Sequence, residues 1–198
     1  EPDPDYDPEA FLALYGSTGC TAYIGMMEVG KVTGDDTVVV SAAAGATGSA
    51  AAQIAKIAGA RVIGIAGGEE KCRWLTEEVG LDGAIDHRHD DVAQKLRELA
   101  PKRVDLFFDN VGGELLDTVL GRLALHARVV LCGHIASYLD DADQPAVGPS
   151  NYVQLIQQRA TMTGFLAFDE VPRFPEIGER LRAWHTAGDI VVRTQRFE

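Results

Sequence analysis

Short apolar runs alternate along the chain with longer amphipathic stretches. The runs are rich in valine, isoleucine and phenylalanine and lack alternating polar residues, which is typical of strands buried on both faces of a parallel sheet. They predict six strands, at Thr37–Ser41, Arg61–Ala66, Gly83–Asp86, Val104–Asp109, Ala127–Cys132 and Thr161–Leu166. The other stretches predict helices at Thr47–Ala58, Glu69–Val79, Asp91–Leu99, Gly113–Arg122 and Pro175–Thr186. This order predicts an α/β fold, a doubly wound six-stranded parallel sheet with helices on both faces.

Three segments lie outside this rhythm. Residues 1–9 (EPDPDYDPE) are acidic and rich in proline, and they predict a solvated lead-in. Residues 10–30 have apolar positions at helical spacing and predict a crossing helix that ends at Gly30. Leu139–Gln154 is polar, contains two prolines and predicts a long loop, a kind of segment that is often functional. Residues 31–198 are then long enough for one α/β domain with a sizeable core.

Composition narrows the classes of function. A hydrophobic content of 46% predicts a folded protein, and the net charge of −12 argues against nucleic acid or a membrane surface as partner. No apolar run approaches the roughly 18–20 residues of a membrane span. Cys20, Cys72 and Cys132 are far apart and odd in number, which predicts a reducing, cytoplasmic setting. His87 and His89 have no cysteine nearby, so we expect no metal site.

Small residues follow the first predicted strand, at Ser41–Gln53 (SAAAGATGSAAAQ). As a dinucleotide fingerprint GxGxxG, this stretch has Ala43 in place of the first glycine, and Gly45 and Gly48 in the other two places. Gly45 lets the backbone approach a pyrophosphate, Gly48 lets the helix pack closely on the strand, and free N–H groups at the helix start hold phosphate. Tight helix packing alone is the alternative. The place on the first strand favours dinucleotide binding.

The end of the second strand indicates which dinucleotide. NAD sites usually hold an aspartate or glutamate there, on the ribose 2′-OH. Here the strand ends in Gly67 and Gly68, and Lys71 follows. The glycines leave room for an added phosphate with which the lysine can pair, so NADP(H) is the expected cofactor. The alternative is that Lys71 lies on a solvated helix face beside Glu69 and Glu70.

Six motifs together resemble the zinc-independent medium-chain dehydrogenase/reductases. The branch they resemble contains the prostaglandin reductases, the leukotriene 12-hydroxydehydrogenases, bacterial NADP-dependent oxidoreductases and plant alkenal double-bond reductases. The motifs are Gly16–Gly30, Val38–Lys56, Val62–Cys72, Phe107–Glu114 (with FDNVGGE), Arg128–Tyr138 (with CGHIASY) and Gly148–Phe165. Members of the family begin with a barrel-like substrate domain and return to it after the nucleotide-binding Rossmann domain. The resemblance therefore implies a Rossmann domain truncated at both ends.

The resemblance also implies a cofactor site. The pyrophosphate would lie against Ala43, Gly45, Thr47 and Gly48. The adenosine 2′-phosphate would lie at Gly67 and Lys71, with His87 in place of the tyrosine usual in the family. The nicotinamide and its ribose would be lined by Thr21, Asn110, Val111, Cys132, Gly133, His134, Phe165, Leu166 and Ala167, with Tyr23 on the same helix as Thr21.

The reaction implied by the resemblance is NADPH-dependent reduction of the carbon–carbon double bond of an enone or alkenal, by hydride transfer to the β-carbon. Tyr138 is the expected proton donor, although it could instead only pack against the cofactor; Tyr152 is the second candidate. A non-catalytic nucleotide-binding module and a quinone or other carbonyl reductase of the same superfamily remain alternatives. The resemblance further implies a homodimer through the edge strand near Thr161–Phe168.

Overall fold

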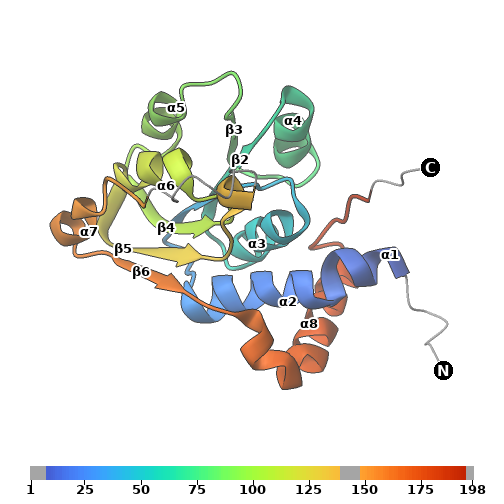
Figure 1. The fold of residues 1–198 in the computed structure, drawn as a ribbon. Helices are drawn as coiled ribbons and strands as arrows, with labels where there is room; N and C mark the ends of the chain where they lie inside the picture. Colours follow the sequence, from blue (N-terminus) through green and yellow to red (C-terminus); the bar gives the residue numbers. More distant parts are fainter. Residues whose placement is uncertain (1–7, 139–147, 195–198) are drawn as a thin grey trace.

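The computed structural model describes residues 8–138, without the side chains of Ser137 and Tyr138, and residues 148–194. Six strands form one parallel sheet in the order β3-β2-β1-β4-β5-β6 (Figure 1). The strands are β1 (Thr37–Val40), β2 (Arg61–Ala66), β3 (Gly83–Asp86), β4 (Val104–Asp109), β5 (Leu123–Leu131) and β6 (Thr161–Gly164). The predicted doubly wound fold is confirmed. The strand order reverses between β1 and β4, and ligands of such sheets bind at the carboxyl ends of the strands on either side of that point.

The apolar runs form strands because both of their faces are covered. Val38 and Val40 belong to one buried cluster and Val39 to the other, since side chains alternate across a strand. The first cluster includes α3 (Ala46–Ile57), α4 (Glu69–Glu77) and α8 (Phe174–Ala187). The second includes α5 (Val92–Leu99) and α6 (Gly113–Leu120). The sheet therefore has helices on both faces.

The segment predicted as one crossing helix is divided at Gly16. It consists of α1 (Pro8–Ala10), the π-helical turn η1 (Phe11–Tyr15), α2 (Ser17–Tyr23) and the π-helical turn η2 (Ile24–Val29). The Gly16 backbone is extended, with ψ −156°, which ends the first helical stretch. Beyond this break α2 packs against α3 and α8 (Figure 1).

The structure differs from the predicted boundaries in three further places. β5 begins at Leu123 rather than Ala127, and it contains an irregularity in register where His126 has a φ of +63°. β6 ends at Gly164, two residues earlier than predicted. A helix, α7 (Val153–Gln158), begins inside the predicted loop; residues 139–147 of that loop lie outside the described residues. Two 3-10 helices, η3 (Ile135–Tyr138) and η4 (Ala167–Arg173), follow β5 and β6.

The last described segment runs beside α3 and is tied to it by one side chain. The buried Gln53 donates from Nε2 to the carbonyl of Val191 at 3.0 Å and accepts from the amide of Val191 at 2.7 Å. Arg193 then pairs with Glu70 of α4. Across the part of the chain that the structure covers, none of the helices has the length and apolarity needed to cross a bilayer.

Candidate functional site

The turn after β1 is shaped by small residues. Ala42 has a φ of +48°, and its carbonyl accepts from the amide of Gly45 at 2.9 Å. A Cβ on Gly48 would lie 2.2 Å from that carbonyl oxygen, so only glycine allows α3 to approach the turn this closely. Gly45 is the N-cap of α3, and because glycine has no side chain it provides no capping group. The amides of the first turn of α3 are therefore available to an anion.

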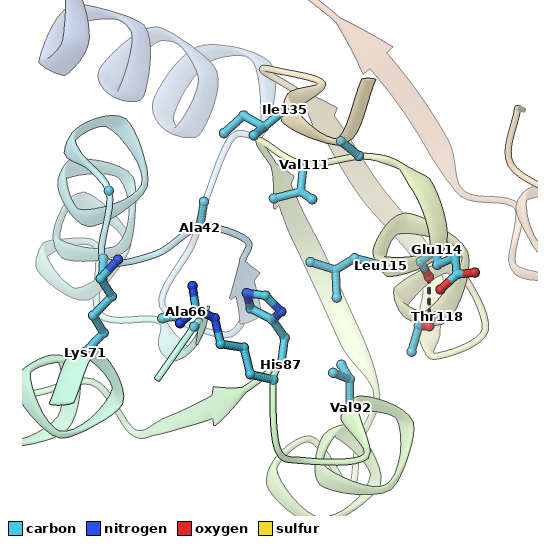
Figure 2. Close-up of a pocket in the computed structure, with 15 residues that line it drawn as sticks. Ala42, Ala66, Lys71, His87, Val92, Val111, Glu114, Leu115, Thr118 and Ile135 are labelled. Atoms are coloured by element: carbon cyan, nitrogen blue, oxygen red, sulfur yellow. Dashed lines mark hydrogen bonds between the residues drawn. The ribbon is translucent and has the colours of Figure 1, made fainter. Parts of the chain in front are cut away.

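A cavity of about 520 Å³ opens at the carboxyl ends of the strands (Figure 2). Its floor is made of the small residues Ala42, Ala44, Gly45, Ala66 and Gly67. One wall is mainly apolar, with Val92, Val111, Leu115, Ile135 and Ala136, and it also includes Glu114 and Thr118. The other end is basic, with Lys71, His87 and Arg88. Figure 2 shows Lys71 and His87 on opposite sides of Ala66, with Leu115 and Val111 across the cavity from Lys71.

The basic end is organised by the carboxylate of Asp86, the last residue of β3. Oδ1 accepts from the amide of Gly68 at 2.8 Å and from the amide of Arg88 at 3.1 Å, and Oδ2 is 2.7 Å from Nδ1 of His89. These hydrogen bonds, first of all that to His89, hold the pKa of Asp86 down at about 2. Asp86 therefore stays ionised and links the end of β2 to the loop after β3.

The opposite end is organised by Asp109, the last residue of β4, which is completely buried. It accepts from the Ser41 hydroxyl at 2.8 Å and from the amides of Val111 and Gly112, each at 3.0 Å. Burial raises the pKa of Asp109 in spite of these donors. Asn110 donates from its side chain to the carbonyl of Ser41 at 2.7 Å. This network fixes the turn after β4 against the end of β1.

The fold and this site can now be compared with known proteins. Residues 46–183 match the zinc-binding dehydrogenase family. The chain belongs to that family. A Bacillus subtilis (strain 168) protein provisionally named NADP-dependent oxidoreductase YfmJ is 43% identical over 182 residues, which are 91% of this chain and 54% of that protein. The NADPH-dependent curcumin reductase of Escherichia coli (strain K12) is 37% identical over 187 residues, 92% of this chain and 54% of the reductase.

A solved structure agrees with these sequence relatives. CurA from Vibrio vulnificus, crystallised in complex with NADPH, matches with a TM-score of 0.87 and 39% identity over 97% of this chain and 58% of CurA. The chain thus spans about half the length of the curated relatives it matches. The resemblance to the medium-chain dehydrogenase/reductases is confirmed. Among residues 8–138 and 148–194 of this family member, no three histidine, cysteine, aspartate or glutamate side chains are grouped to hold a metal ion.

Five of the expected cofactor residues line the cavity of this dehydrogenase-family chain: Gly45, Gly67, Lys71, His87 and Val111. Three others lie on either side of Gly45 in the sequence: Ala43 is in the turn after β1, and Thr47 and Gly48 are in the first turn of α3. Asn110, Gly133 and His134 surround the turn after β4: the Gly133 amide donates to Asp109 and His134 packs against Gly112. Burial raises the pKa of the neighbouring Cys132 thiol to about 12, so it stays protonated at neutral pH.

Thr21, Phe165, Leu166 and Ala167 do not line the cavity. Thr21 donates its hydroxyl to the carbonyl of Ser17 within α2. A Cβ on Gly25 would lie only 2.6 Å from Cζ of Phe165, so the Phe165 ring packs against η2. Leu166 is exposed and Ala167 is buried. Tyr138 ends η3, and its side chain lies outside what the structure describes; Tyr152 is 61% exposed and does not line the cavity.

Sequence reasoning missed several lining residues. Arg88 had a usable signal, because it directly follows His87 at the end of β3, and the carboxyl ends of parallel strands meet at one edge of the sheet. Val92 and Leu115 had none, since they read as ordinary apolar positions of α5 and α6. Their exposure to a cavity depends on how the two helices are placed on the sheet.

Proposed function

We propose that this chain is the nucleotide-binding part of an NADPH-dependent reductase of the carbon–carbon double bond in α,β-unsaturated aldehydes and ketones. The relatives support it, since they include a curcumin reductase named for NADPH and a structure with NADPH bound. The observation that carries it is the end of β2. Gly67 stands where an NAD site usually has an acidic residue, and the cations Lys71 and Arg88 line the same end of the cavity.

The residues present fit NADP(H). The open amides at the start of α3 and the exposed backbone of Gly45 suit a pyrophosphate, with Ala43, Thr47 and Gly48 shaping the turn. Lys71 and His87 suit a 2′-phosphate beside Gly67. The nicotinamide half would be held by residues of α2 and of the segments after β4, β5 and β6: Thr21, Asn110, Val111, Cys132, Gly133, His134, Phe165, Leu166 and Ala167.

When bound, NADPH supplies hydride to the substrate β-carbon and leaves an enolate whose oxygen needs a hydrogen-bond donor. We assign that donor to the Tyr138 hydroxyl. Ile135 and Ala136 of the same 3-10 helix line the cavity, which supports this assignment. Tyr152 is the second candidate, and it is mostly solvated in this structure.

The test uses the complete protein with NADPH and a simple alkenal, followed by the loss of NADPH absorbance. We expect alkenal-dependent oxidation that is faster with NADPH than with NADH. Tyr138→Phe should lower turnover by about 10²–10⁴-fold, the usual contribution of a positioned proton donor, with the Kd of NADPH changed by less than about twofold. Tyr152→Phe is the matched control and should leave turnover nearly unchanged. If Tyr152→Phe lowers turnover and Tyr138→Phe does not, the donor is Tyr152.

The same assay separates the alternatives. Binding of NADPH without oxidation by an alkenal or a quinone would show a non-catalytic nucleotide-binding module. Oxidation with a quinone alone would show a quinone reductase of the same superfamily. A cytoplasmic location and a homodimer through the region Thr161–Phe168 belong to the same proposal.

A further inference from the structure

The basic end of the cavity contains an arginine that the family resemblance does not assign to the cofactor. Arg88 lies on the loop after β3 and lines the cavity together with His87 and Lys71. The following inference rests on the proposed binding of NADP(H) and concerns how the 2′-phosphate is distinguished from a 2′-hydroxyl.

Arg88 and His87 converge on the end of β2. A Cβ on Gly67 would lie 2.9 Å from Nε of Arg88, 2.9 Å from Nε2 of His87 and 3.4 Å from Cζ of Arg88. Two side chains from the loop after β3 therefore cover the backbone of the neighbouring strand at one point. That point is the strand end where an acidic residue holds the ribose in NAD sites.

Asp86 fixes the loop in this position. Its carboxylate bonds the amide of Arg88 at 3.1 Å and the amide of Gly68 at 2.8 Å, so the backbone of Arg88 is tied to the residue that follows Gly67. The amide of Asp86 donates to the Asp90 carboxylate at 2.9 Å, and the amide of His87 donates to the carbonyl of Ala66 at 3.0 Å. Four hydrogen bonds thus hold the three successive residues Asp86, His87 and Arg88.

No carboxylate among the described residues forms an ion pair with Arg88. Within residues 8–138 and 148–194, no ion pair involves the side chains of Arg88, His87 or Lys71. This stands out in a chain whose net charge is −12. The carboxylate of Asp86 is close, but both of its oxygens already accept hydrogen bonds. The guanidinium of Arg88, next to the backbone of Gly67 and without such an ion pair, suits a dianionic phosphate better than a hydroxyl.

We infer that Arg88 is a specificity-determining residue for the 2′-phosphate and that Asp86 is the residue that positions it. Lys71 approaches from α4, on the other side of Ala66 from His87 (Figure 2). Arg88 differs from Lys71 in presenting a planar fork that can bond two phosphate oxygens at once. The phosphate is thereby held between an element after β2 and an element after β3.

The test uses two probes that differ only by the 2′-phosphate, 2′,5′-ADP and 5′-AMP, with calorimetry on the whole chain. Arg88→Gln should lower the preference for 2′,5′-ADP over 5′-AMP by about tenfold or more, the scale of a lost charged hydrogen bond, and leave the Kd of 5′-AMP nearly unchanged. Arg97→Gln removes the same charge from an exposed position on α5 outside the cavity and should change neither value.

Three results would overturn the inference. An unchanged preference in Arg88→Gln shows that Arg88 does not read the phosphate. An equal loss of affinity for 2′,5′-ADP and for 5′-AMP shows that Arg88 has a general role in holding adenosine. If the unaltered protein binds 5′-AMP and 2′,5′-ADP equally, the proposed NADP(H) function fails first, and the inference fails with it.

A double-mutant cycle tests the part assigned to Asp86. Asp86→Asn keeps the side-chain volume but loses one acceptor, so it should lower the preference for 2′,5′-ADP when Arg88 is present. In the Arg88→Gln background the same change should have almost no further effect on that preference. A purely structural role for Asp86 would instead weaken both probes by the same factor in both backgrounds, and this would contradict the assignment.

Discussion

Ala42 has a backbone conformation that suits glycine better than a residue with a side chain. Its φ of +48° is favourable for glycine and costs an alanine about 1–2 kcal/mol. Ala42→Gly should therefore raise the free energy of unfolding by about 0.5–1 kcal/mol, after the extra entropy of the unfolded glycine is subtracted. Urea denaturation measures this. Ala44→Gly, at a position without positive φ, is the control and should be destabilising; a loss of stability in both variants would contradict the argument.

The link between β2 and β3 makes stability depend on pH. The pKa of Asp86 is about 2 in the folded protein, below its ordinary 3.8, chiefly because of the hydrogen bond to His89. A lowered carboxyl pKa stabilises the folded state fully above pH 3.8, and the contribution is lost as the pH falls toward about 2. Asp86→Asn should be less stable than the unaltered protein at pH 5, and the difference should shrink steadily below pH 3.8. A constant difference across this range would show that ionisation of Asp86 is not involved.

The order of elements could be predicted from the sequence, but several boundaries could not. The runs that form β1, β2 and β4 are mainly apolar, with Val38–Val40 and Leu106–Phe108 uninterrupted, so burial on both faces was evident from the sequence. The first residues of β5 include exposed Leu125 and His126, and a positive φ interrupts their register, so the pattern hid four residues of strand. The break at Gly16, where the backbone is extended, is another boundary that a helical period does not reveal.

The same distinction applies to the site. Gly67 directly follows β2, Gly45 is the N-cap of the helix after β1, and Lys71 lies in the first turn of the helix after β2. The meeting of strand ends at one edge made them predictable. The buried network of Asp109 with Ser41 joins residues 68 positions apart, and only the pairing of β1 with β4 brings them together. The sequence indicated Asp109 as a strand end without indicating its partner.

At the scale of the whole molecule, β6 is an edge strand of the sheet. This strand pairs with β5 on one side, and no described strand covers its other side. The exposed Phe168 and Val171 follow it on η4. We expect two copies to pair along this edge, because an uncovered edge strand beside apolar side chains favours association. Thr163→Lys, which places a charge on β6, should shift the protein from dimer to monomer in light scattering. Thr76→Lys on the surface of α4 should not; a monomeric unaltered protein would contradict the expectation.

The two hydrogen bonds between the Gln53 side chain and the Val191 backbone should slow hydrogen exchange at Val191. Val191 lies in no helix or strand, yet its amide donates to a buried side chain at 2.7 Å and its carbonyl accepts from the same side chain. Amide protons in irregular segments normally exchange with deuterium quickly, because nothing holds them. The proton of Val191 should instead exchange as slowly as those within α3, and Gln53→Ala should release it without affecting α3 itself. One glutamine side chain thus protects the backbone of an irregular segment from exchange with solvent in the way that a helix or strand normally does.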